Sequence, residues 1–210
     1  MQNKRCDMQS NKRSKNKEQI LKITYLALLT ALVFVIQLLG GSIKVGGLFS
    51  ITLVLLPIVL GAVLVGPLGG AWLGFVFALA VFYTGDAAAF LAVSPFGTIV
   101  TVVLKGVLAG LMSGLVYKAL PKERPFLRAF VAAAVCPLVN TGIFFLGCVA
   151  FFLPTIEGWA QGLGFASAGE YMVFGLAGIN FVVELVTNIL LVPILVRLVS
   201  ILERQIGIAK

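Results

Sequence analysis

Residues 95–117 read PFGTIVTVVLKGVLAGLMSGLVY, an apolar stretch whose single charged residue is Lys105. A helix needs about 20 apolar residues to cross the hydrocarbon core of a bilayer, so this stretch predicts a membrane-spanning helix. Gly106, Gly110 and Gly114 recur within it at every fourth position. That spacing puts the three glycines on one helix face, where another backbone can approach closely. We expect the face to pack inside a helix bundle, with packing against a partner as the alternative.

The rest of the chain has the same apolar character. Hydrophobic residues make up 60% of the 210 residues and charged residues 11%, whereas about a quarter of the residues in soluble domains are charged. We therefore predict an all-α integral membrane protein built as a bundle of six transmembrane helices. The expected spans are 20–39, 49–65, 71–83, 95–117, 129–153 and 171–199. A further short helix is expected at the outer surface, at 87–93.

Charged residues predict the orientation of this bundle. Basic residues crowd the N-terminal region, return in the loop 118–128 and close the chain, whereas Asp86, Glu157 and Glu170 fall in loops of the other parity. Because loops rich in Lys and Arg stay in the cytoplasm, both termini are predicted to be cytoplasmic. The basic excess thus indicates topology and contact with membrane lipid, not nucleic-acid binding.

The same patterns divide the chain into three parts. Residues 1–19 are polar and lack apolar periodicity, which predicts a disordered basic cytoplasmic tail. Residues 20–202 form the predicted six-helix transmembrane domain. Residues 203–210 form a second cytoplasmic tail.

Several classes of chemistry lack their residues here. The chain has no histidine, which removes histidine-based catalytic sites and histidine-bearing metal sites. No P-loop motif occurs, so the chain cannot itself be a P-loop ATPase. We predict no catalytic residues, no metal and no cofactor, and we infer that any uphill transport takes its energy from elsewhere.

A few polar residues fall inside the predicted spans. Lys105 lies well inside the fourth span, and Asn180, Glu184 and Asn188 recur every fourth residue in the sixth, on one helix face. A charge at the bilayer centre costs about 2.5–3.5 kcal/mol on insertion scales. We therefore expect Lys105 and Glu184 to face the bundle interior. They either pair with each other, which would only fix the helix packing, or contact a polar ligand.

At this point the chain resembles the substrate-binding S components of energy-coupling factor (ECF) vitamin transporters, in the group that includes riboflavin, folate and pantothenate binders. The resemblance extends from about Ile20 to the end of the chain and rests on the order and spacing of several motifs. These are Ala27-x-x-x-Ala31, Gly66-Pro67-Leu68-Gly69-Gly70-Ala71, the segment from Lys105 to Gly114, and Val139-Asn140-Thr141.

The resemblance implies a substrate-binding subunit of an ATP-driven importer in a prokaryotic plasma membrane. Ala27 and Ala31 would match the small-residue motif that docks onto a transmembrane coupling subunit, and two cytoplasmic ATPases would supply the energy. The ligand would be a small water-soluble vitamin or related micronutrient, held near the outer face of a six-helix bundle.

Ligand-contacting residues diverge among S components, so the pocket is predicted from position. The candidate substrate-binding residues are Gln37, Lys44, Tyr83, Asp86, Lys105, Asn180 and Glu184. Two lysines favour a carboxylate-bearing ligand such as pantothenate. Riboflavin comes next, because it could stack on aromatic residues such as Phe90 or Trp159.

Two other functions fit parts of the sequence. A self-contained ion-coupled carrier or channel would need a coupling acid, for which Glu184 is the only deep carboxylate. A small membrane enzyme would need paired acids or a histidine, which the spans lack. Copurification with a coupling protein and ATPases would distinguish the importer subunit from the carrier.

Overall fold

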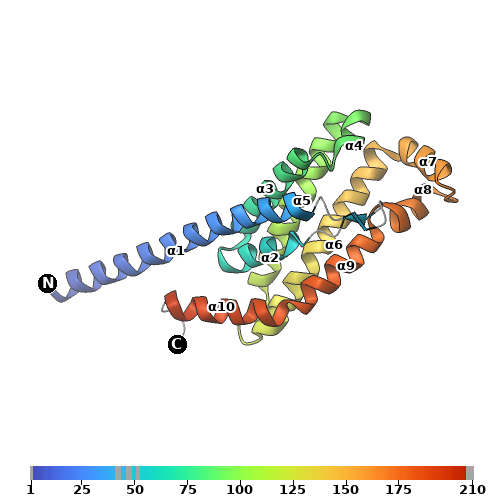
Figure 1. Ribbon diagram of the computed structural model, residues 1–210. Helices are drawn as coiled ribbons and strands as arrows, with labels where there is room; N and C mark the ends of the chain where they lie inside the picture. Colours follow the sequence, from blue (N-terminus) through green and yellow to red (C-terminus); the bar gives the residue numbers. More distant parts are fainter. Residues whose placement is uncertain (1, 41–43, 46–48, 51–52, 207–210) are drawn as a thin grey trace.

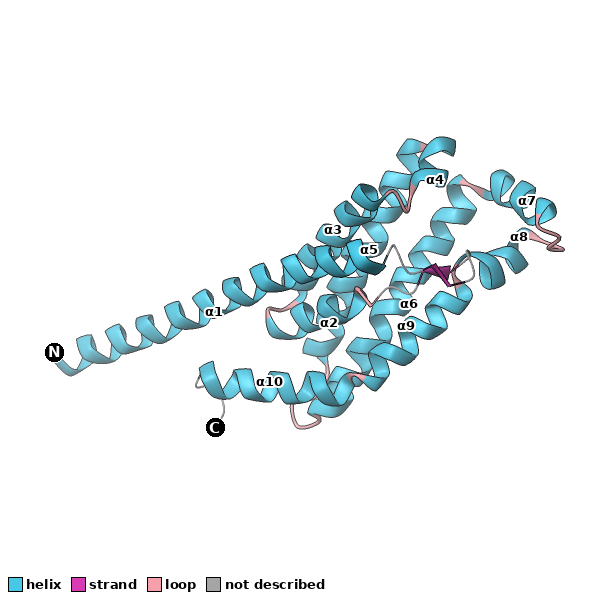
Figure 2. Ribbon diagram, viewed as in Figure 1, coloured by secondary structure: helices cyan, strands magenta, loops and turns pink. Residues whose placement is uncertain are grey.

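The computed structural model describes residues 2–40, 44–45, 49–50 and 53–206, and it is helical almost throughout (Figures 1 and 2). The elements, in chain order, are α1 (Gln2–Gly40), β1 (Lys44–Val45), β2 (Phe49–Ser50), α2 (Leu55–Leu64), α3 (Pro67–Thr84), α4 (Ala88–Val93), α5 (Pro95–Ala119), α6 (Pro125–Phe151), α7 (Leu153–Gly162), α8 (Ala168–Glu170), the π-helical turn η1 (Tyr171–Leu176), α9 (Gly178–Leu190) and α10 (Val192–Ile206). The two short strands pair antiparallel, with Lys44 opposite Ser50.

Within the described residues, four helices are long and apolar enough to cross a membrane: residues Asn16–Leu39 of α1, α3, α5 and α6. A fifth span is reached if Ala168–Leu176 and Asn180–Leu190, which meet at a 44° bend, count as one. The helix α2 has 10 residues, about 15 Å of helix, which is half of the hydrocarbon core. The chain is therefore a multi-helix membrane protein, and length alone does not give six full spans.

Two expected spans differ from the structure. The second was expected at 49–65, but residues 49–50 form β2 and the helix starts only at Leu55. The sixth was expected to be continuous over 171–199, but it breaks into η1, α9 and α10. Apolar composition is shared by buried strands, short helices and spans, so composition alone could not separate them.

The first helix extends through the residues expected to be a disordered tail. Helix α1 starts at Gln2 and projects beyond the bundle (Figure 1). Lys, Arg, Gln and Glu are good helix formers, and the apolar part of the helix provides a nucleus from which it can propagate. At the other end α10 runs to Ile206, into the expected second tail, while residues 207–210 lie outside the described part.

Glycines hold α3 and α5 in close contact. A Cβ added at Gly74 would overlap the carbonyl oxygen of Gly106, and one added at Gly70 would overlap that of Gly110. The pairing runs in opposite directions along the two helices, so they are antiparallel neighbours. Gly114 continues the contact, because a Cβ there would lie 2.6 Å from the Cα of Pro67. Because glycine has no side chain, the two backbones can come into contact, as expected for this spacing.

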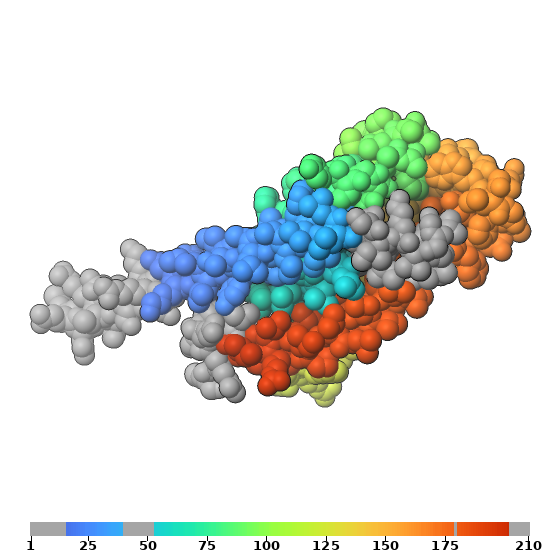
Figure 3. Space-filling view, in the orientation of Figure 1, coloured from blue at the N-terminus to red at the C-terminus, as the bar shows by residue number. Residues whose placement is uncertain are grey.

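Helix α1 packs on the bundle through one stripe and leaves the opposite stripe uncovered. Leu29, Val33 and Gln37 recur every fourth residue and are buried. Ala27 and Ala31 lie on the exposed face of the same helix. Figure 3 shows residues 16–39 of α1, in blue, along the outer surface of the molecule. The small residues of this motif therefore do not pack inside the bundle.

A second apolar cluster lies beyond the main core, at the end of the bundle that carries α4, α7 and α8 (Figure 1). Phe152, the N-cap of α7, and Ile156 within α7 are fully buried there. Tyr171 and Met172 of η1 belong to the same cluster. The stretch 154–170, expected to be an outer loop, thus contains α7 and α8. The short helix expected at 87–93 is α4.

Candidate functional site

A cavity of about 250 Å³ lies where α1, α3, α4, α5, α6 and the bent segment 171–190 meet. Both polar and apolar side chains line it. The polar lining residues are Gln37, Asp86, Thr98, Thr101, Lys105, Asn140, Thr141, Asn180 and Glu184, and the aromatic ones are Phe77, Phe90, Phe144 and Phe152. Because a membrane interior excludes isolated polar groups, a cavity lined in this way inside a helix bundle is a candidate ligand site.

Gln37 and Asp86 form one polar pair in the cavity wall. The amide nitrogen Nε2 of Gln37 donates to Oδ2 of Asp86 at 2.6 Å, and Thr84 Oγ1 donates to the same oxygen at 2.8 Å. Gly85 ends α3 in the left-handed conformation, with φ of 77°, which residues with a side chain rarely adopt. This turn brings Asp86 under the C-terminal end of α1.

Asn180 and Glu184 form a second pair within α9. The Asn180 Nδ2 donates to Glu184 Oε1 at 3.2 Å, one helical turn away. Glu184 is 5% exposed, and Asn188 continues the same buried stripe at 3%. Their spacing explains the geometry, since residues four apart lie above one another on a helix. The second pair therefore presents a carboxylate and an amide together to the cavity.

Lys105 brings a positive charge to the cavity from α5. Its Nζ lies 5.6 Å from the ring centroid of Phe77 and 5.2 Å from that of Phe144. Within the part of the chain that the structure describes, Lys105 forms neither a hydrogen bond nor a salt bridge. Two ring faces attract an ammonium by cation–π interaction, but they leave its three N–H donors available.

Among the residues that the structure describes, four buried oxygens around the cavity have no hydrogen-bond partner. They are Gln37 Oε1, Thr101 Oγ1, Asn140 Oδ1 and Asn180 Oδ1, and all four residues line the cavity. Native structures rarely leave such atoms unsatisfied, and those that remain call for a water, an ion or a ligand. Because all four atoms lie at one cavity, this cavity is the candidate binding site for a polar molecule.

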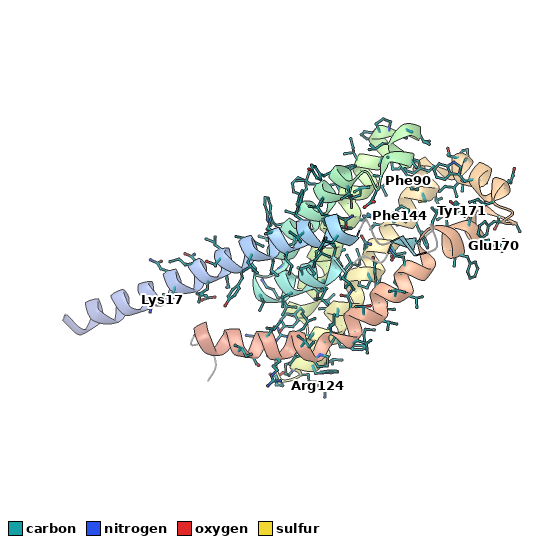
Figure 4. All side chains as sticks on the ribbon, viewed as in Figure 1. Lys17, Phe90, Arg124, Phe144, Glu170 and Tyr171 are labelled. Atoms are coloured by element: carbon teal, nitrogen blue, oxygen red, sulfur yellow. The ribbon has the colours of Figure 1, made fainter. Side chains whose placement is uncertain are left out.

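Aromatic rings close the cavity on the side of α4. Phe90 packs edge-on against Phe144, Phe152 and Trp159, with ring centroids 5.8, 5.0 and 5.5 Å apart. Figure 4 shows Phe90 and Phe144 toward the end of the bundle that carries Tyr171 and Glu170, opposite Arg124. This wall gives the cavity an apolar surface on which a planar group could lie.

The structure brings most of the predicted residues together. Gln37, Asp86, Lys105, Asn180 and Glu184 line the cavity. Tyr83 does not: it is 73% exposed and its ring lies 5.5 Å from that of Phe34. The side chain of Lys44 lies outside the described residues.

The position of Tyr83 outside the cavity has a geometric cause. Phe77 and Val81 of α3 line the cavity, and Tyr83 is two residues further on, about 200° around the helix from Val81 at 3.6 residues per turn. Sequence reasoning left out Thr101 although a signal existed, because Thr101 precedes Lys105 by four residues and shares its helix face. Within the described residues no group of His, Cys, Asp or Glu side chains could hold a metal ion.

Comparison with known proteins assigns the family. A family model described as "ECF transporter, substrate-specific component" matches residues 21–199, a range that includes every described residue of the cavity. No curated protein and no solved structure matches the chain. The match agrees with a multi-helix membrane protein that has a partly polar cavity among its helices. The chain therefore belongs to the substrate-specific components of ECF transporters, and it is the substrate-binding subunit of a membrane transporter.

Proposed function

We propose that the chain captures a small water-soluble vitamin, or a related micronutrient, in the cavity around Lys105 and passes it to an ATP-driven ECF importer. One observation carries the proposal. The ammonium of Lys105 lies among aromatic rings with no anion within salt-bridge distance in the described structure. A charge buried in this way is costly unless it is paired, so a ligand that brings an anionic or strongly accepting group would complete the site.

The choice of vitamin follows from the same residue. A carboxylate-bearing ligand such as pantothenate would pair with Lys105 directly and is our first candidate. Riboflavin is the second, because Phe90 and Phe144 offer ring faces or edges to a planar ligand. The two candidates predict different losses when Lys105 is neutralised: large for the carboxylate and smaller for the flavin.

The proposed topology has six membrane segments, with both termini in the cytoplasm of a prokaryotic cell. It counts α2 and the bent segment 171–190 together with the four long spans. Arg124 lies at the end of the bundle opposite Phe90 and Glu170 (Figure 4). A basic residue at that end supports its assignment as the cytoplasmic face. The cavity would then open toward the outside.

Energy coupling would occur on α1. Ala27 and Ala31 lie on its exposed face, and small residues four apart let a second helix approach closely in a membrane. We propose that this face binds the transmembrane coupling subunit, which works with two cytoplasmic ATPases. The cavity and this docking face are separate surfaces, so binding and uptake can be perturbed independently.

The test is a thermal-stability screen of the purified protein against water-soluble vitamins. A ligand at 100 times its Kd stabilises the native state by about 2.7 kcal/mol. Replacing Lys105 by Met should weaken binding of a carboxylate ligand roughly 10- to 150-fold, the cost of losing a charged hydrogen bond of about 1.5–3 kcal/mol. Lys122→Met is the matched control, because Lys122 is exposed in the loop between α5 and α6.

The results separate the proposal from its rivals. Unchanged affinity in Lys105→Met would contradict the role of Lys105, and a blank panel with the wild-type protein would contradict a vitamin as ligand. Uptake by the chain alone in proteoliposomes, driven by an ion gradient, would show a self-contained carrier instead. Copurification with a coupling protein and ATPases is the outcome we expect.

A further inference from the structure

Two amide groups in the cavity wall have a fixed orientation. Gln37 and Asn180 each donate their amide nitrogen to a carboxylate, Asp86 and Glu184 respectively. An ionised carboxylate can only accept hydrogen bonds, so the nitrogen of each amide must face it. The carbonyl oxygens are thereby left as the free ends, and both are buried without a partner. The two pairs come from different parts of the bundle. Gln37–Asp86 joins α1 to the turn after α3, and Asn180–Glu184 lies within α9.

The remaining unpartnered atoms extend this accepting surface. Thr101 is 4% exposed and Asn140 is 8% exposed, and each has a buried side-chain oxygen without a partner. Among the described residues, the cavity wall thus combines two carboxylates and two carbonyl oxygens fixed as acceptors with the ammonium of Lys105, while the Thr101 hydroxyl and the Asn140 amide can accept or donate. Groups that only accept therefore outnumber groups that only donate on this wall.

Building on the proposed function, we infer that the ligand is rich in hydrogen-bond donors: a polyhydroxylated or amide-bearing molecule that turns several O–H or N–H groups toward Gln37, Asn180, Thr101 and Asn140, and its single anionic or strongly accepting group toward Lys105. A carboxylate alone does not satisfy the site. Molecules of similar size that lack donors would leave the buried oxygens unpaired, and such unpaired groups produce strong discrimination.

The chain offers a matched pair of residues for the test. Thr98 and Thr101 are both buried in α5 and both line the cavity. The Thr98 hydroxyl already donates to the carbonyl oxygen of Ser94 at 2.8 Å, whereas the Thr101 oxygen has no partner. Replacing either by Val keeps the shape and removes the hydroxyl. Only at Thr101 does the substitution remove an unsatisfied group.

The first experiment compares ligand-free proteins. Removing an unpartnered buried hydroxyl is neutral or stabilising, so Thr101→Val should melt at the wild-type temperature or above it. A lower melting temperature than that of Thr98→Val would show that the Thr101 oxygen already serves the empty fold, and would overturn the inference. This comparison needs no ligand, so it decides the matter even if a blank vitamin panel has contradicted the proposed function.

The second experiment uses two pairs of probes. Pantothenate carries a carboxylate, two hydroxyls and an amide N–H, whereas nicotinate carries a carboxylate and no donor at neutral pH. Riboflavin carries a hydroxylated side chain that lumiflavin lacks. We expect the donor-rich member of the pair that binds to stabilise the protein. Thr101→Val should weaken the affinity for that molecule roughly 5- to 150-fold. Equal stabilisation by nicotinate or lumiflavin, or unchanged affinity in Thr101→Val, would refute the inference.

Discussion

Replacing Gly110 by Ala tests the contact that positions Lys105. Gly110 of α5 faces Gly70 of α3, and an added Cβ would come inside 3.0 Å of the Gly70 carbonyl oxygen and carbon. The obstacle is backbone, so no rotamer change can relieve the overlap. The two helices must separate, and α3 and α5 carry Phe77 and Lys105 of the cavity wall between them.

The expected magnitude is the difference between two opposing terms. Ala is a better helix former than Gly by about 1 kcal/mol, which stabilises the variant. Overpacking typically costs about 1–3 kcal/mol, and a clash with rigid backbone belongs at the upper end of that range. We therefore expect Gly110→Ala to lose about 2 kcal/mol of unfolding free energy.

Gly142 provides the control in a neighbouring helix. It lies within α6, and a Cβ added there meets nothing within 4 Å. Gly142→Ala should gain up to about 1 kcal/mol from helix propensity. Reversible unfolding of the two variants in mixed micelles measures both values. If Gly110→Ala were as stable as Gly142→Ala, the close approach of α3 and α5 would be wrong.

Two further substitutions test other contacts. Replacing Ala27 and Ala31 together by Leu should abolish uptake in cells and leave ligand binding by the purified subunit unchanged, because the bulk is added on an exposed helix face. The control is Ala150→Leu, at an exposed position of α6. Weakened ligand binding with intact assembly would contradict the docking role. Replacing Ser113 by Ala removes the hydrogen bond that its Oγ donates to the Ala132 carbonyl oxygen at 2.9 Å. Unfolding measurements should show that the free energy of unfolding falls by about 0.6 kcal/mol. A larger fall than that of Gly110→Ala would show that this hydrogen bond stabilises the bundle more than the glycine contact does.

The long spans could be predicted from the sequence because their helices are uninterrupted. The helix α5 starts at Pro95 as expected, while α3 and α6 start at Pro67 and Pro125, each four residues before the expected span. Both prolines occupy the first helical turn, where a missing N–H costs nothing. We had expected both prolines in loops because turn residues surround them, although proline is also common at the start of a helix.

The cavity could be predicted only in part. Asn180 and Glu184 follow a helical spacing that the sequence displays, and a deep Lys105 implies an interior position on cost alone. The pairing of Gln37 with Asp86 joins residues 49 positions apart and depends on how α1 meets the end of α3. No local pattern contains that information, and the same lack of tertiary context explains why Tyr83 was expected at the site.

The bend in the segment 171–190 and the cavity are physically connected. Gly178 follows the π-helical turn, and a Cβ there would overlap the carbonyl oxygen of Val173, so the break requires a residue without a side chain. Interrupted helix is tolerated at membrane depth only where it is buried in protein or lines a polar cavity. Leu176, Ala177 and Asn180 at the bend do line the cavity. The interruption that shortens this span is therefore stable because a polar cavity adjoins it, and it turns the wall segment carrying Asn180 and Glu184 toward that cavity.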